Sequence, residues 1–125
     1  MGLQGEASGY VQASADEVFA VVIDLKGLPQ WNERMTGVVE LPNRLEPGAE
    51  WVVSLRLMGM RFNSRSTVLE LDRGRRRFMH RSRREHSPSS TVWTWTVRPE
   101  GTGAVVTLAW ERAALGRMVR ERSLS

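Results

Sequence analysis

The chain of 125 residues contains no cysteine, which excludes disulfide bonds and thiol chemistry. Its only histidines are His80 and His86, too few for a histidine-rich zinc site. No apolar run approaches the roughly 20 residues that a membrane-spanning helix requires. The first residues lack the basic start and apolar stretch of a secretory signal peptide. We therefore expect a cytoplasmic protein that uses neither a metal nor a cofactor.

Lysine is nearly absent, because Lys26 is the only one among 18 basic residues, and the net charge is +4. The hydrophobic content of 41% is ordinary for a folded domain and argues against global disorder. A chain of this length buries roughly two thirds of the surface that its unfolded form exposes. We expect one domain with a core of its own.

A short amphipathic helix is predicted to begin after Ser14. Ser14 is a favourable N-cap, and Glu17 three residues later completes a capping box. Apolar residues recur with helical spacing over 18–25. We expect Gly27 to end this helix, and a second short helical turn to follow over 28–32.

The rest of the chain has the period of two that is typical of strands. The expected strands are 5–12, 36–42, 50–58, 60–71, 75–84, 91–98 and 104–112. Turns rich in glycine, proline and aspartate separate most of them, which predicts an antiparallel meander. The tail from Ala113 to Ser125 has weak helical periodicity. This order predicts an α+β fold, in which helices cover one face of a sheet of about seven strands.

Five segments carry a resemblance to a known family. They are Ala-Ser-Ala-Asp-Glu-Val-Phe at 13–19, Asp-Leu at 24–25, Leu-Pro-Gln-Trp-Asn at 28–32, Pro-Gly-Ala-Glu-Trp at 47–51 and Gly-Thr-Gly-Ala-Val-Val-Thr at 101–107. In order and spacing they resemble the helix-grip fold of the START and birch-pollen-allergen (SRPBCC) superfamily. Within it, the chain is similar to the polyketide cyclase/dehydrase and lipid-transport family.

The resemblance implies a curved antiparallel sheet, two short helices after the first strand and a C-terminal helix gripped by the sheet. Residues 1–125 would form a single helix-grip domain with a cavity for a lipid, a polyketide or a similar apolar molecule. Only 13 residues follow Arg112, enough for a helix of about 20 Å. This lid would be short, incomplete or supplied by another subunit, which leaves a homodimer open.

The expected cavity wall is built from the inward positions of the strands and the corner after the second helix. Large aromatic rings and adaptable apolar side chains suit such a wall, although each tryptophan could equally be a packing residue. The expected ligand-binding residues are Trp31, Met35, Trp51, Val53, Leu55, Phe78, His80, Trp93, Trp95, Val106, Leu108 and Trp110. We expect a small hydrophobic or amphipathic ligand, held mainly by burial of its apolar surface.

Two further interpretations remain open. In the first, the protein is an aromatase or cyclase that folds a polyketide by confinement, with His80 and Arg84 as weak candidates for moving protons. In the second, Arg77, Arg81 and Arg83 form a basic stripe on the outer sheet face that contacts an acidic partner, nucleic acid or an anionic membrane. A solvated face, paired with carboxylates, is the simpler interpretation of that stripe.

Overall fold

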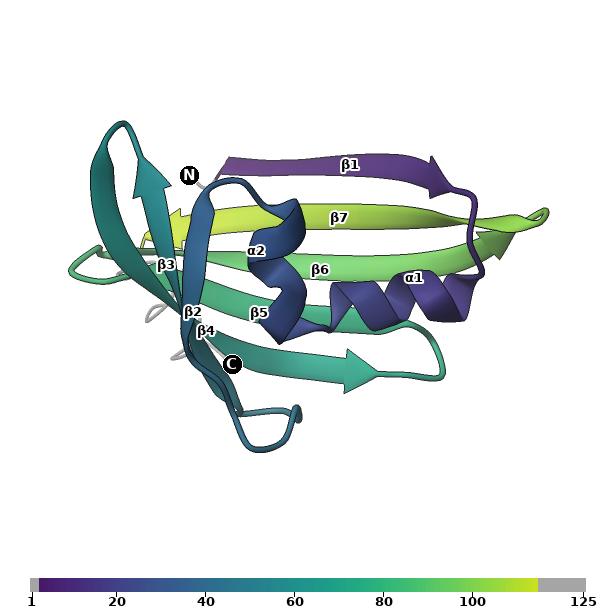
Figure 1. Ribbon diagram of the computed structural model, residues 1–125, viewed down its shortest axis with the longest axis horizontal. Helices are drawn as coiled ribbons and strands as arrows, with labels where there is room; N and C mark the ends of the chain where they lie inside the picture. Colours follow the sequence, from purple (N-terminus) through teal and green to yellow (C-terminus); the bar gives the residue numbers. More distant parts are fainter. Residues whose placement is uncertain (1–2, 115–125) are drawn as a thin grey trace.

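The computed structural model describes residues 3–114, which form one antiparallel sheet of seven strands with its helices on one side (Figure 1). The elements are β1 (Leu3–Val11), α1 (Ala15–Val22), the 3-10 turn η1 (Leu25–Gly27), α2 (Leu28–Trp31), β2 (Met35–Glu40), β3 (Glu50–Leu57), β4 (Met60–Asp72), β5 (Arg77–Arg84), β6 (Ser89–Glu100) and β7 (Gly103–Ala114). Their order across the sheet is β1-β7-β6-β5-β4-β3-β2. In Figure 1, β2 and β3 run steeply across the direction of β6 and β7, so the sheet curves around the helices.

Helix α1 begins as the sequence predicts and ends earlier. The Ser14 hydroxyl accepts a hydrogen bond from the Glu17 amide, and the Glu17 carboxylate accepts one from the Ser14 amide. The helix was expected to reach Gly27, and that prediction was wrong. The backbone of Asp24 leaves the helical region, and its side chain accepts from the Gly27 amide at 3.3 Å. This local bond starts a separate 3-10 turn, in line with the preference of aspartate for caps over helix interiors.

The strands agree with the predicted meander, with small differences at their ends. Strand β5 begins at Arg77, two residues later than expected, because the Asp72 side chain holds the Arg75 amide in a turn and Arg76 has a φ of 53°. Ala113 and Ala114 extend β7, whereas a helix was expected from Ala113; the rest of that expected helix lies outside the described residues. Within residues 3–114, no helix is long and apolar enough to cross a membrane.

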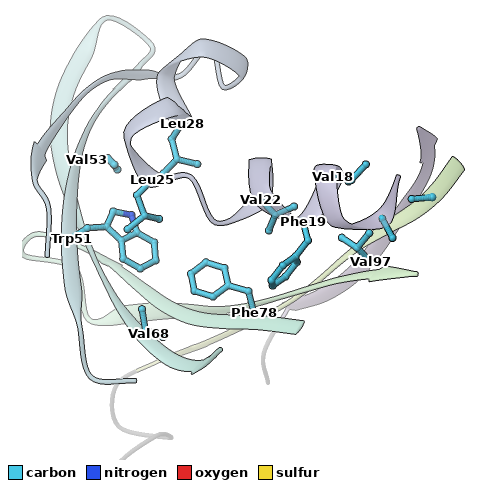
Figure 2. Close-up of a cluster of buried hydrophobic side chains, with 12 residues drawn as sticks. Val18, Phe19, Val22, Leu25, Leu28, Trp51, Val53, Val68, Phe78 and Val97 are labelled. Carbon is cyan, nitrogen blue, oxygen red and sulfur yellow. The ribbon is translucent and has the colours of Figure 1, made fainter. Parts of the chain in front are cut away.

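The hydrophobic core lies between α1 and the sheet. Figure 2 shows Phe19 and Val22 of α1 pointing toward Phe78 of β5, and both phenylalanines are almost completely buried. At the other end of the cluster, Leu25 of η1 approaches Trp51 of β3. The apolar stripe of the sequence therefore continues past the end of α1 into η1, which turns the chain over the curved part of the sheet.

Strand β1 lies at the edge of the sheet, and two of its glycines offer a test of packing against β7. A Cβ atom on Gly5 would overlap the ring of Trp110, whereas a Cβ on Gly9 would meet nothing within 4 Å. We expect Gly5→Ala to lower the free energy of unfolding by about 1–3 kcal/mol, because it forces the ring aside. Gly9→Ala on the same strand should be neutral or slightly stabilising. Urea denaturation of both variants measures the difference, and equal effects would contradict this packing.

Candidate functional site: a cavity with aromatic walls and a polar strip

A cavity of about 330 Å³ lies beside the core, between the turn η1–α2 and the curved part of the sheet. Its volume is at the lower end of the range of small-molecule sites, which span roughly 300–1,000 Å³. Leu25, Leu28 and Trp31 close it from the helical side. Strands β2 to β7 supply the remaining wall, so the bend of the sheet creates the hollow.

Ten of the twelve residues expected in the wall line this cavity. They are Trp31, Met35, Trp51, Val53, Leu55, Phe78, His80, Trp93, Trp95 and Leu108. The alternation along β3, β5 and β6 was sufficient to place most of them. Val106 instead packs against the core cluster. Trp110 lies beyond the cavity, with its ring centroid 6.5 Å from that of Trp93 and its ring over Gly5.

The rings of the wall form a continuous series across three strands. The Trp51 and His80 centroids are 4.9 Å apart, and the Phe78 and His80 centroids 5.3 Å apart. The Trp93 ring stacks on the other side of His80 at 6.4 Å. At the end of α2, the ring of Trp31 packs edge to face against that of Trp95, with 6.0 Å between the centroids. Flat rings in these orientations give the cavity an apolar and partly preformed wall.

His80 is embedded among these rings. Its Nδ1 is buried and has no hydrogen-bond partner within residues 3–114. Burial lowers the pKa of His80 from 6.5 to about 3, because the charged form loses its solvation and gains no anionic partner. The imidazole is therefore neutral near pH 7. It contributes hydrogen-bonding capacity to the wall without adding charge.

Serines continue the polar part of the wall. Ser64 and Ser66 of β4 are buried residues that line the cavity, and Ser82 of β5 lines it beside them. Ser66 and Ser82 are opposite each other in the sheet register. The Trp93 indole N–H donates to the Ser82 hydroxyl at 2.7 Å. Ser64, Ser66, His80 and Ser82 together form what we call the polar strip.

Several residues of the wall were not among the expected ligand-binding residues. Phe62 lines the cavity because β4 returns directly opposite Leu55 of β3. Arg34 and Arg56 also border it where β2 begins, and there the Arg56 amide donates to the Arg34 carbonyl at 2.8 Å. The remaining unanticipated residues of the wall are Val22, Leu25, Leu28, Asn32 and Leu57. Phe62, Ser64 and Ser66 alternate along β4, so the period of two could have indicated Phe62; nothing in the sequence indicated the two arginines.

Arg84, the second weak candidate for proton transfer, stands beside the cavity and outside its wall. Its guanidinium carbon lies 4.9 Å from the centroid of the Phe62 ring. The residue is exposed, and it is opposite Ser64 in the register of β4 and β5. This position fixes a positive charge near the polar strip without placing it inside the hollow.

The outer sheet face carries charges of both signs. Arg77 donates to Glu70 at 2.9 Å, and Arg65 pairs with Glu50 at 3.1 Å. Arg81 is half-buried, and its Nε has no partner within the part of the chain that the structure describes. Arg83 is exposed. Of the three arginines of the expected stripe, Arg77 is paired with a carboxylate, whereas Arg81 and Arg83 have no ion pair within residues 3–114.

The sequence and the fold both resemble known proteins. The family model for polyketide cyclase/dehydrase and lipid transport matches residues 4–122. No curated protein sequence matches the chain. Among solved structures, an aromatase/cyclase from a Streptomyces species is 18% identical, with a TM-score of 0.75; the match covers 91% of this chain and 69% of that one.

Two further structures extend the likeness. Ara h 8.0201 is 11% identical, with a TM-score of 0.75 over 99% of this chain and 91% of that chain. A START superfamily protein from Mycobacterium smegmatis is 16% identical, with a TM-score of 0.73 over 89% and 77% of the two chains. At these identities the structural likeness shows a shared helix-grip fold. The match of the family model over almost the whole sequence goes further, and the chain belongs to the polyketide cyclase/dehydrase and lipid transport family.

Proposed function

We propose that the protein binds a small hydrophobic or amphipathic ligand in the cavity between the helical turn and the sheet. The observation that carries this proposal is the cavity. Its wall includes inward-facing tryptophans, which therefore border a space and do not simply fill the core. Burial of apolar surface, at roughly 25 cal/mol per Å², would supply most of the binding free energy. The preformed ring wall would lower the entropic cost of binding.

Ligand binding without chemistry is the better-supported role for His80. A general acid or base works best when its pKa lies near the working pH, whereas the pKa of His80 is lowered to about 3. No described side chain orients its ring by a hydrogen bond to Nδ1. Cyclisation by confinement remains the second candidate, supported by the family's own description and by the unpaired imidazole in the cavity.

A variant that fills the cavity tests the proposal. We expect Leu55→Trp to weaken binding of the apolar dye N-phenyl-1-naphthylamine about tenfold or more, because Leu55 lines a cavity that has little room to spare. Val39→Trp is the matched control, since Val39 is 54% exposed and lies outside the cavity wall. Fluorescence titration measures both dissociation constants. Equal affinities in the two variants, or no binding by the wild type, would contradict the proposal.

Native mass spectrometry of the purified protein gives an independent measurement. A bound small molecule that is retained by the wild type and lost in Leu55→Trp would place that molecule in the cavity. The same spectrum counts subunits and so tests whether a second copy associates with this one.

A further inference from the structure

We infer that the polar strip recognises an uncharged oxygen of the ligand, a carbonyl or a hydroxyl, so that the occupant is an oxygenated molecule rather than a bare hydrocarbon chain. This inference rests on the proposed binding function and adds the chemical class of the ligand. Its basis is the accessibility of the polar atoms of Ser64, Ser66 and His80 inside an otherwise apolar wall.

The two serine hydroxyls are free to meet a ligand. Ser64 and Ser66 are 8% and 4% exposed as residues. Within residues 3–114 neither hydroxyl has a hydrogen-bond partner, yet neither is sealed in the packing. Both residues line the cavity, so this part of the wall is within reach of an occupant. A ligand oxygen that reaches them would find two hydroxyls that no described protein group already occupies.

His80 presents one nitrogen to the same space. Its Nδ1 is sealed and unpaired, whereas Nε2 is neither sealed nor bonded to another described residue. A buried N–H without a hydrogen-bond partner is rarer than a buried acceptor without one. This favours the tautomer in which Nδ1 is unprotonated and Nε2 carries the hydrogen. His80 lines the cavity and Nε2 is its accessible nitrogen, so we infer that this N–H donates to an occupant of the cavity. A donor in the same cavity wall as two unbonded hydroxyls suits an acceptor on the ligand.

The strip is also selective for a neutral group. The imidazole carries no charge near pH 7, and the Ser82 hydroxyl already accepts from the Trp93 indole, which leaves its hydrogen available to donate. No lysine, arginine or carboxylate belongs to the strip. Arg34 and Arg56 border the cavity where β2 begins, and Arg84 stands beside the strip outside the wall. An ionised carboxylate at the strip would lose its solvation and could pair only by reaching past the strip to one of these arginines, whereas a ketone would lose little.

Three probes with one ring system separate these contributions: 2-ethylnaphthalene, 2-acetylnaphthalene and 2-naphthoate. We expect His80→Phe to lower the affinity for 2-acetylnaphthalene about five- to tenfold, which is the effect of one net hydrogen bond. Ser66→Ala should lower the same affinity about threefold. In both variants the affinity for 2-ethylnaphthalene should stay within about twofold of the wild-type value, because the apolar wall persists. The affinity for 2-naphthoate should be unchanged. Ser54→Ala, which removes a hydroxyl bonded to Thr36 and outside the cavity wall, is the matched control.

The outcomes distinguish the two proposals. If the wild type binds 2-ethylnaphthalene and neither strip variant changes the ratio of ketone to hydrocarbon affinity, the inference fails while the binding function stands. If 2-naphthoate loses as much affinity as the ketone in His80→Phe, the preference for an uncharged oxygen is wrong. If no probe binds the wild type, the proposed function itself fails.

Discussion

Replacement of Phe78 by alanine should lower the free energy of unfolding by about 3–5 kcal/mol, the usual loss for deletion of a buried phenylalanine ring. Phe78 is 1% exposed and stacks on Trp51 with 6.0 Å between ring centroids. It also stands between the α1 core and the cavity, and it belongs to both. Removing the ring would join the vacated space to the existing hollow, and the remaining side chains could not collapse to fill it.

Phe62→Ala is the matched control for this prediction. Phe62 is also an inward phenylalanine of the sheet, but it is half-buried at the border of the cavity, with Arg84 over its ring. We expect it to cost only about 1 kcal/mol, because a partly exposed ring loses less surface on folding. Urea denaturation of both variants gives the comparison. A loss at Phe78 no larger than at Phe62 would mean that the cavity wall is not part of the core.

The outline of the fold was accessible from local sequence patterns. The capping box at Ser14 and the period-two strands each reflect interactions between residues close in sequence, and the structure confirms both. The end of α1 was predicted wrongly because glycine at 27 is a strong helix terminator, whereas α1 ends at Val22 and Asp24 caps the separate 3-10 turn that follows. The apolar periodicity runs on through Leu25 and carries no trace of this change from α-helix to 3-10 turn.

The candidate site was partly predictable for a related reason. Alternation tells which face a residue occupies, so it placed Trp51, Phe78 and Trp93 in the wall correctly. It does not tell where along the strand the face is hollow. That depends on the bend of the sheet and on how far η1 and α2 extend over it, which is why Trp110 was included and Phe62 was missed.

His80 makes the second large prediction, which concerns stability in acid. The pKa of His80 is about 3 in the folded protein and 6.5 in the unfolded chain. Above about pH 6.5 both states hold a neutral imidazole, so the residue adds no pH dependence. Between these values the unfolded chain binds a proton that the folded protein does not. The free energy of unfolding must therefore fall as the pH is lowered through this window, by up to 1.36 kcal/mol for each unit of pH.

We accordingly expect wild-type stability to fall by roughly 3 kcal/mol more than that of His80→Phe between pH 7 and pH 4, since the phenyl ring keeps the contacts with Trp51 and Trp93 and cannot be protonated. Other acid-sensitive groups contribute equally to both proteins and cancel in the difference. His86→Asn is the control; it removes the exposed histidine, and asparagine suits the φ of 64° at that position. Urea denaturation at several pH values measures the three profiles. If the stability of wild type and His80→Phe falls in parallel as the pH is lowered, the prediction is wrong. Water or an acidic group would then reach the imidazole, and the polar strip of the cavity would be hydrated.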